Sequence, residues 1–242
     1  MTNPRKVEGA FFDHFSRADK PTKFGIGLVK IMSRKIFGFA GAGSGSRILE
    51  IGPGRGAIAD ICLERGIEYC AVEPNEQMAA SLEKRGAYVV RAIVPPLPEL
   101  DRNFDVVVMI NVMEHMNGMQ DALQISRQIR EVLKPRGKLI ISSPDYLNWR
   151  LNFFNCDFSH NYVTTRRRLR QLLLDTGYEN IKSFYLSGPL SGFLCLLVTA
   201  FVSRLPFGLL NAIFPDNKIF YKLYKIQLTF LRKVLIIGEK AG

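Results

Sequence analysis

Short apolar runs alternate with amphipathic stretches along most of the chain, and this alternation is the first clue to its fold. The runs are rich in β-branched residues and are bounded by Gly, Pro or Asp, which is typical of buried strands. The first group of runs lies at 47–51, 68–72, 87–92, 104–110 and 137–142. Two later runs, at 181–187 and 233–240, predict the last strands of a seven-stranded sheet.

Helical periodicity fills the intervals between the runs. Ala122, Ile125 and Ile129 recur at helical spacing within 119–134, and Pro135 ends that segment. Further helices are predicted at 75–85 and 165–176. Because strand and helix alternate repeatedly, the sequence predicts an α/β fold with a doubly wound, mostly parallel sheet. Ligands of such sheets bind beyond the carboxyl ends of the strands.

The stretch RILEIGPGRGAIAD at 47–60 leads from the first predicted strand into a helix through three glycines. Gly52, Gly54 and Gly56 lack a Cβ atom, so the backbone can turn sharply and direct N–H groups at a ligand. A turn without a ligand needs one glycine rather than three. Together with Ala57, the glycines also satisfy the loose pattern of a dinucleotide site. They therefore do not separate NAD from another nucleotide cofactor.

Two acidic residues near the glycines narrow the choice of ligand. Glu73 follows the second predicted strand, 21 positions after Gly52, where an acid can accept the hydroxyl protons of a ribose. Pro74 beside it belongs to the same predicted site. Glu50 precedes the first glycine by two residues. A carboxylate there would repel a pyrophosphate and attract an ammonium group, which favours a ligand with a cationic end.

Four segments, ILEIGPGRGAIA, VEPNEQM, FDVVVMINVMEHM and LKPRGKLIISSP, resemble the successive motifs of the class I S-adenosylmethionine-dependent methyltransferases. The resemblance covers roughly residues 45 to 187. It implies a Rossmann-like fold, S-adenosyl-L-methionine as the cofactor, and Glu73 as the residue that holds the ribose. The residues implied to line the methionyl side are Glu50, Gly52, Gly54 and Gly56.

The chain departs from that family where many members place an acid to contact the adenine amino group. Here Ala92 and Ile93 occupy the position. We therefore expect Ile93 to contact the adenine ring through apolar surface, without a side-chain hydrogen bond. Asn111, after the fourth strand, lies at the rim where the cofactor sits in relatives, and we include it in the predicted cofactor site.

The reaction implied by the resemblance is a direct displacement at a sulfonium methyl group, which needs no metal. The histidines, His14, His115 and His160, are too scattered along the sequence to predict a metal site. An alcohol acceptor would benefit from a base, because a neutral hydroxyl is a poor nucleophile. The candidates are His115, His160 and Asp145. The alternative for His115 is packing beside the cofactor, the alternative for His160 is a place in a surface loop, and an isolated acid such as Asp145 is more often a turn residue.

The net charge of the chain indicates which binding partners to expect, and its cysteines indicate the cellular compartment. The chain of 242 residues carries 33 Lys and Arg against 22 Asp and Glu, a net charge of +11, which favours anionic partners. Nucleic acid is not expected, because the basic residues are spread out and no aromatic-interleaved strand pair accompanies them. The four cysteines show no paired spacing, and no secretory signal is evident in the first thirty residues, so we expect a cytoplasmic protein.

An apolar insertion precedes the last predicted strand. From 187 to 215 the only charged residue is Arg204, and Pro189 and Pro206 interrupt the run. We therefore expect a hairpin that is buried or lies at an interface rather than a membrane span. Lys218, Lys222 and Lys225 follow near one helical face. The insertion is either a lid over the substrate pocket or a surface that meets an anionic membrane.

These observations divide the chain into an N-terminal helical segment, a cofactor-binding core, the insertion and a last strand. The predicted ranges are 1–44, 45–187, 188–232 and 233–242. The resulting hypothesis is methyl transfer to an oxygen of a small or lipid-linked acceptor, such as a glycan, a quinone precursor or a lipid. Carbon or nitrogen as the acceptor atom, an NAD-type oxidoreductase and a non-catalytic cofactor-binding protein remain open alternatives.

Overall fold

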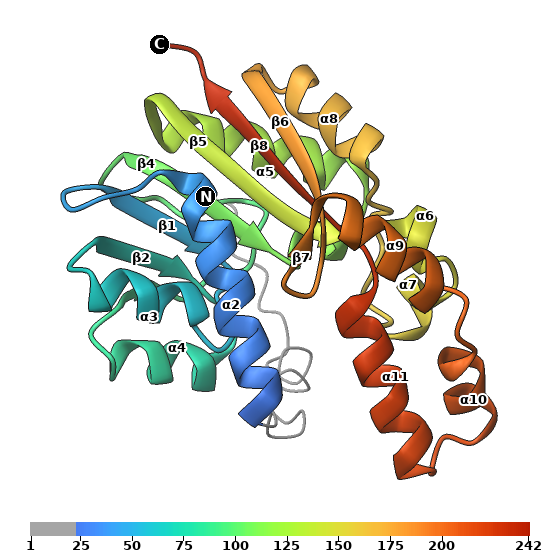
Figure 1. The fold of residues 1–242 in the computed structure, drawn as a ribbon. Coiled ribbons are helices and arrows are strands. Elements are labelled where there is room, and N and C mark those ends of the chain that lie inside the picture. Colours follow the sequence, from blue (N-terminus) through green and yellow to red (C-terminus); the bar gives the residue numbers. More distant parts are fainter. Residues whose placement is uncertain (1–22) are drawn as a thin grey trace.

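The computed structural model describes residues 23–242, and its centre is one mixed sheet (Figure 1). The strands follow the order β3-β2-β1-β4-β5-β8-β6-β7. The first five in this order are parallel, whereas β8 is antiparallel to both of its neighbours and β7 is antiparallel to β6. The strands are β1 (Arg47–Ile51), β2 (Glu68–Val72), β3 (Tyr88–Val90), β4 (Phe104–Ile110), β5 (Leu133–Pro144), β6 (Tyr178–Ser187), β7 (Leu190–Ser191) and β8 (Lys233–Lys240).

The predicted doubly wound α/β fold is confirmed, although the strands differ from the prediction in their number and in some of their bounds. The sheet has eight strands instead of seven, because the insertion begins with the two-residue strand β7. The predicted strand 137–142 extends to 133–144. Leu133 and Lys134, which we assigned to the end of a helix, belong to β5, where Leu133 pairs with Phe104 before a register shift.

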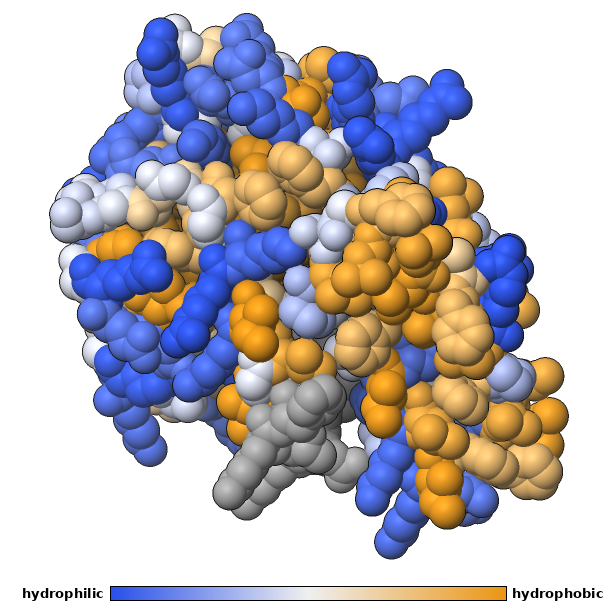
Figure 2. Space-filling view, viewed as in Figure 1, coloured by the Kyte–Doolittle hydropathy of each residue, from blue (hydrophilic) through white to orange (hydrophobic). Residues whose placement is uncertain are grey.

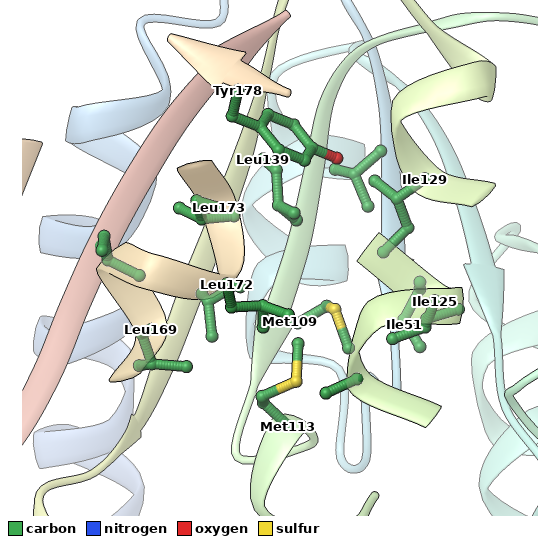
Figure 3. Packing of buried hydrophobic residues seen from close by; sticks show 14 of the residues in the cluster. Ile51, Met109, Met113, Ile125, Ile129, Leu139, Leu169, Leu172, Leu173 and Tyr178 are labelled. Carbon is green, nitrogen blue, oxygen red and sulfur yellow. The ribbon is translucent and has the colours of Figure 1, made fainter. Parts of the chain in front are cut away.

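Helices cover both faces of the sheet and enclose two apolar clusters. One face carries α2 (Lys23–Ala40), α3 (Ala57–Glu64) and α4 (Glu76–Glu83), and the other carries α5 (Met119–Val132) and α8 (Arg166–Asp175). Alternate residues of a strand serve opposite faces. Ile51, Met109, Ile125 and Leu169 belong to the cluster on the face of α5 and α8 (Figure 3), whereas Ile48 belongs to the cluster on the opposite face. Burial on both faces explains why the strands are continuous apolar runs.

Side-chain caps start two of the helices close to the predicted positions. Asn75 precedes α4 and accepts a hydrogen bond from the Met78 N–H at 2.9 Å. Thr165 precedes α8 and accepts one from the Arg168 N–H at 3.2 Å. Such caps satisfy backbone donors that the first helical turn leaves without a partner. The predicted residues 1–22 of the N-terminal segment lie outside the described part of the chain.

The insertion forms three helices that project beside the carboxyl end of β5 (Figure 1): α9 (Gly192–Val202), α10 (Phe207–Ile213) and α11 (Lys218–Phe230). By length and composition, the stretch Gly192–Ile213 is long and apolar enough to cross a membrane, but residues 203–206 divide it into two helices. The stretch is not buried, because Phe193, Phe201 and Leu209 expose 75%, 67% and 63% of their surface.

Candidate functional site

A cavity of about 820 Å³ opens beyond the carboxyl ends of β1, β2 and β4. All the predicted site residues except Asp145 line it. Side chains of the insertion, Lys225 and Leu228, contribute to its wall together with Trp149, from the short helix α6 (Tyr146–Trp149). The cavity therefore connects the glycine turn with the helices that precede the last strand.

The three glycines of the turn have different physical reasons for lacking a side chain. A Cβ atom at Gly52 would lie 2.6 Å from Val112 Cγ2, and one at Gly56 would lie 2.5 Å from Leu82 Cδ2. A side chain at either position would therefore have to displace a neighbouring side chain, and it would also be strained by the positive φ, which is +65° at Gly52 and +76° at Gly56. At Gly54, with φ +54°, a Cβ atom would meet nothing within 4 Å. Gly54 is therefore the glycine that leaves space for a ligand in the cavity.

Glu73 lies opposite this glycine and ties the turn to the end of β2. Its Oε2 accepts a hydrogen bond from the Gly54 N–H at 3.2 Å, and its Oε1 accepts one from the Asn75 N–H at 2.9 Å. Burial raises the pKa of Glu73, and the two backbone hydrogen bonds oppose the increase. Each carboxylate oxygen can accept a further hydrogen bond. The arrangement fits the two hydroxyl groups of a ribose.

Glu50 is a buried acid on the other side of the turn. The Tyr69 hydroxyl donates a hydrogen bond to its Oε2 at 2.6 Å. Burial is the main reason why the pKa of Glu50 rises to about 7, and the nearby carboxylate of Glu73 raises it further. Within residues 23–242 no Lys or Arg forms a salt bridge with Glu50. A ligand ammonium would supply the missing positive charge, so the residues present fit the methionyl end of S-adenosylmethionine.

The remaining predicted cofactor residues lie on the same cavity wall. Ile93 faces the cavity with its neighbours Ala92 and Val94, as expected for apolar contact with a base. Asn111 also lines the cavity, in a left-handed conformation with φ +53°. Its Oδ1 accepts a hydrogen bond from Lys233 Nζ at 3.1 Å, which joins the end of β4 to the start of β8.

A second polar group lies in the same cavity, at the one-turn helix η1 (Met113–His115) and the loop before α8. Glu114, His115 and His160 each offer an oxygen or nitrogen atom within 4.8 Å of the others. His115 and His160 are far apart in the sequence, but the structure brings their ring centroids within 4.8 Å of each other. His14 lies outside the described residues. The loop that precedes α8 packs against η1, where the Asn161 and Tyr162 N–H groups donate to the Glu114 carbonyl oxygen, and so it brings together residues that are distant in the sequence.

The hydrogen bonds around this group fix its side chains. His115 Nδ1 lies 2.7 Å from Ser159 Oγ, which in turn donates to Asp157 Oδ1 at 2.6 Å. Although burial acts to raise the pKa of Asp157, the two hydrogen bonds from Ser159 and the electrostatic effect of the nearby His115 and His160 hold that pKa below its usual value. Burial also lowers the pKa of His160 and raises that of Glu114 to about 7.

Sequence reasoning overlooked Asp157 and Ser159, although both are in the same polar segment as His160. The spacing Asp-Phe-Ser-His would have indicated a hydrogen-bonded turn, because Asp and Ser side chains bond readily to groups two residues away. It would not have indicated His115 as the partner of Ser159, since 44 positions separate the two.

Asp145 is a correction to the predicted catalytic residues. Its side chain is fully buried and forms a salt bridge with Arg232, with Oδ2 2.6 Å from Nη2. Burial raises the pKa of Asp145, and the Arg232 guanidinium opposes the increase. The residue ends β5 beside the antiparallel strand β8, so it meets the basic residue that enters β8. Asp145 thus joins the end of the insertion to the sheet.

Comparisons with known proteins agree with this geometry. The profile of the methyltransferase domain family matches residues 30–183. An uncharacterized methyltransferase of Mycobacterium sp. strain JLS is 33% identical over 100 residues, which are 40% of this chain and 38% of the relative. The matched region thus spans less than two fifths of that relative's length.

Two solved structures show the same fold at low sequence identity. A SAM-dependent methyltransferase from Archaeoglobus fulgidus has a TM-score of 0.61 and 22% identity, over 96% of this chain and 98% of that one. Phosphoethanolamine N-methyltransferase 2 of Haemonchus contortus, in complex with S-adenosyl-L-methionine, has a TM-score of 0.64 and 16% identity, over 98% of this chain and 61% of that one.

Proposed function

The chain belongs to the methyltransferase domain family, and from this premise we propose that it uses S-adenosyl-L-methionine to methylate an oxygen of a lipid-linked acceptor. The observation that carries the proposal is the composition of one cavity. Its wall combines the glycine turn with Glu50 and Glu73, a group of histidines, and residues of a helical insertion whose outer surface is apolar.

Residues of the turn would hold the cofactor. Glu50 would bind its ammonium group and Glu73 its ribose, while Gly54 leaves room for the chain between them. When bound there, S-adenosylmethionine supplies a methyl group on a positively charged sulfur. The task of the protein is to align the acceptor with that methyl group, and such alignment contributes several kcal/mol to lowering the barrier.

The contribution of the helical insertion to the cavity favours an acceptor substrate with an apolar portion. Lys225 and Leu228 of α11 line the cavity. Many side chains of α9, of α10 and of the residue after α10 are apolar and exposed; they include Phe193, Leu194, Leu197, Phe201, Leu209, Ile213 and Phe214. The insertion therefore combines the two roles considered from the sequence, with one surface toward the pocket and another toward an apolar partner.

We propose an anionic membrane as that partner. Figure 2 shows apolar surface over α9 to α11 with hydrophilic side chains at its lower edge. Lys218, Lys222 and Lys225 are exposed on α11, and between Asp216 and Glu239 the sequence contains no acid. Each basic side chain near an anionic leaflet contributes about 1 kcal/mol, in addition to the burial of apolar groups. We place the protein at the cytoplasmic face, where its four unpaired cysteines would stay reduced.

Vesicle sedimentation tests the membrane part of the proposal. The protein should sediment with vesicles that contain phosphatidylglycerol at low salt and should be released at high salt. Phe201→Asp should weaken sedimentation, whereas Met119→Asp, at an exposed apolar position on α5, should not. Protein that stays in the supernatant with anionic vesicles at low salt contradicts membrane attachment.

Mass spectrometry tests the acceptor. Lipids and glycans should be extracted from cells that produce the native protein and from cells that produce Glu73→Ala. One species from the native cells should be heavier by one CH₂ unit than the corresponding species from the Glu73→Ala cells. Fragmentation should place the extra methyl group on oxygen. Glu131→Ala, which removes an exposed acid of α5, is the matched control and should leave the species unchanged. A methyl group on nitrogen or carbon contradicts the proposed acceptor atom.

A further inference from the structure

We propose that Glu114, His115 and His160 bind a divalent transition-metal ion at the acceptor end of the cavity. The inference rests on the proposed function for its chemistry, but its geometry stands by itself. The three side chains line one cavity, and one ligand atom of each lies within 4.8 Å of the others. Two imidazoles and a carboxylate are a ligand set that leaves coordination positions open for substrate.

The tautomer of His160 suits a metal ligand. Its Nδ1 lies 2.6 Å from the backbone carbonyl oxygen of Phe153. A carbonyl oxygen can only accept a hydrogen bond, so Nδ1 carries the proton and the lone pair is on Nε2. A histidine that binds a metal through one nitrogen commonly donates its other N–H to a carbonyl or a carboxylate in this way.

His115 has the same arrangement through a serine. Ser159 Oγ donates its only proton to Asp157 Oδ1, at 2.6 Å. The oxygen must therefore accept the bond from His115 Nδ1, which is 2.7 Å away. The proton of His115 is thereby placed on Nδ1 and its lone pair on Nε2. Asp157, Ser159 and the Phe153 carbonyl thus fix the tautomer of both imidazoles, with the lone pair on Nε2, as is common in histidines that bind a metal.

Glu114 gives evidence for a bound cation that does not depend on the histidines. Its side chain is fully buried, and its Oε2 accepts a hydrogen bond from Ser143 Oγ at 2.8 Å. Its Oε1 is buried without a hydrogen-bond partner among the described residues. A buried carboxylate oxygen without a partner is costly, and a cation would compensate it.

The charges around the group leave room for a cation. Glu114 and Asp157 are acidic, and Lys233 is the basic residue whose charge acts on Glu114. Lys233 Nζ donates to Asn111 Oδ1, at 3.1 Å. Because imidazole donors suit later transition metals such as Fe²⁺, Ni²⁺ or Zn²⁺ better than Mg²⁺, Ca²⁺ or Mn²⁺, the site is expected to select one of the former.

The ion would take the place of a protein base. An acceptor hydroxyl bound to it has a lowered pKa, so its O–H bond breaks, the proton passes to water, and the electron pair stays on the oxygen that is to be methylated. Open coordination positions favour an acceptor whose reacting hydroxyl has a neighbouring oxygen that binds the same ion. The alternative, His115 as a general base oriented by Ser159 and Asp157, needs no ion.

The test is metal binding by the full chain without an affinity tag that contains histidine. After treatment with a chelator, the protein should bind one Co²⁺ per chain, with visible absorption typical of imidazole ligation. Glu114→Gln and His160→Gln should each weaken Co²⁺ binding about 100-fold or more, and Ser159→Ala about 10-fold. Glu50→Gln, at a buried acid in another part of the same cavity, is the control and should bind Co²⁺ normally.

Binding of S-adenosylhomocysteine, measured by calorimetry on the same samples, separates the two proposals. Protein that binds the nucleoside but no Co²⁺ overturns the metal site and leaves the proposed function in place. Equal Co²⁺ binding by native protein, Glu114→Gln and His160→Gln also overturns it. Absence of nucleoside binding contradicts the proposed function, whatever the metal result. Circular dichroism of each variant confirms that the protein being compared is folded.

Discussion

The Gly54 N–H donates a hydrogen bond to the carboxylate of Glu73, with an N···O distance of 3.2 Å. This bond joins the turn after β1 to the end of β2 across the mouth of the cavity. The carboxylate proposed to hold the ribose therefore also fixes the loop proposed to hold the methionyl part. A change at Glu73 should affect both parts of cofactor binding together.

Glu73→Gln should lower the affinity for S-adenosylhomocysteine. The amide oxygen can still accept one backbone hydrogen bond, but the charge and the second acceptor are lost. The loss of a hydrogen bond to a charged group is worth about 1.5 to 3 kcal/mol, so the dissociation constant should rise by about 10-fold to 100-fold. Calorimetric titration measures it, with Glu131→Gln as the control. An unchanged constant would contradict the role of Glu73.

Glu50 should make cofactor binding dependent on pH. Its pKa of about 7 lies above the ordinary value of 4.5 because the group is buried. Only the ionised form attracts an ammonium, so affinity should fall as the pH drops from 8 to 6. Binding near pH 7 should also release a proton, which calorimetry in buffers of different ionisation enthalpy detects. In Glu50→Gln, both the pH dependence and the proton release should disappear.

The raised pKa of Glu50 also affects the free energy of unfolding. This free energy should fall as the pH rises, whereas cofactor affinity should increase. Folded protein binds the Glu50 proton more tightly than unfolded protein, so the free energy of unfolding falls as the pH rises from about 4.5 through about 7. Without cofactor at pH 8, Glu50→Gln should therefore raise this free energy, by up to about 3 kcal/mol. Urea unfolding of both proteins at pH 5 and pH 8 measures the difference. A variant that is less stable at pH 8 contradicts the cost of the buried charge.

Substitution of the glycines should separate packing from ligand binding. In Gly56→Ala the new Cβ atom would lie 2.5 Å from Leu82 and 2.6 Å from Arg85 Nη2, so the melting temperature should fall. In Gly54→Ala the Cβ atom meets no protein atom within 4 Å. The left-handed conformation there costs about 1–2 kcal/mol, and the main effect should be weaker nucleoside binding. Thermal unfolding and titration of both variants check this contrast. Equal loss of stability would contradict it.

The strands and the cofactor turn were predictable because they depend on neighbouring residues. Buried β-branched runs gave the bounds of β1, β2, β4 and β8 correctly. The turn and Glu73 follow strand ends directly, so parallel strands alone bring them together. The strand β7 was missed because two residues carry no periodic pattern.

The acceptor end was not predictable in the same way, because it depends on which loops meet. His115 and Ser159 are 44 positions apart and lie together only because η1 packs under the loop that precedes α8. The role predicted for Asp145 failed for a similar reason. An acid at the end of a strand suggests a site, and only the antiparallel position of β8 reveals Arg232 as its partner.

Asp145→Asn should therefore act on stability rather than on chemistry. Removing one charge of a buried pair leaves the other without its partner, at a cost of about 3–5 kcal/mol when both are fully buried. Arg232 keeps 20% of its side-chain surface exposed, so the loss should be smaller, about 1–3 kcal/mol. Urea unfolding measures that loss, whereas the affinity of the folded variant for S-adenosylhomocysteine should stay unchanged. A catalytic Asp145 would instead give a stable protein with lost methyl transfer, and that outcome would restore the role expected from the sequence.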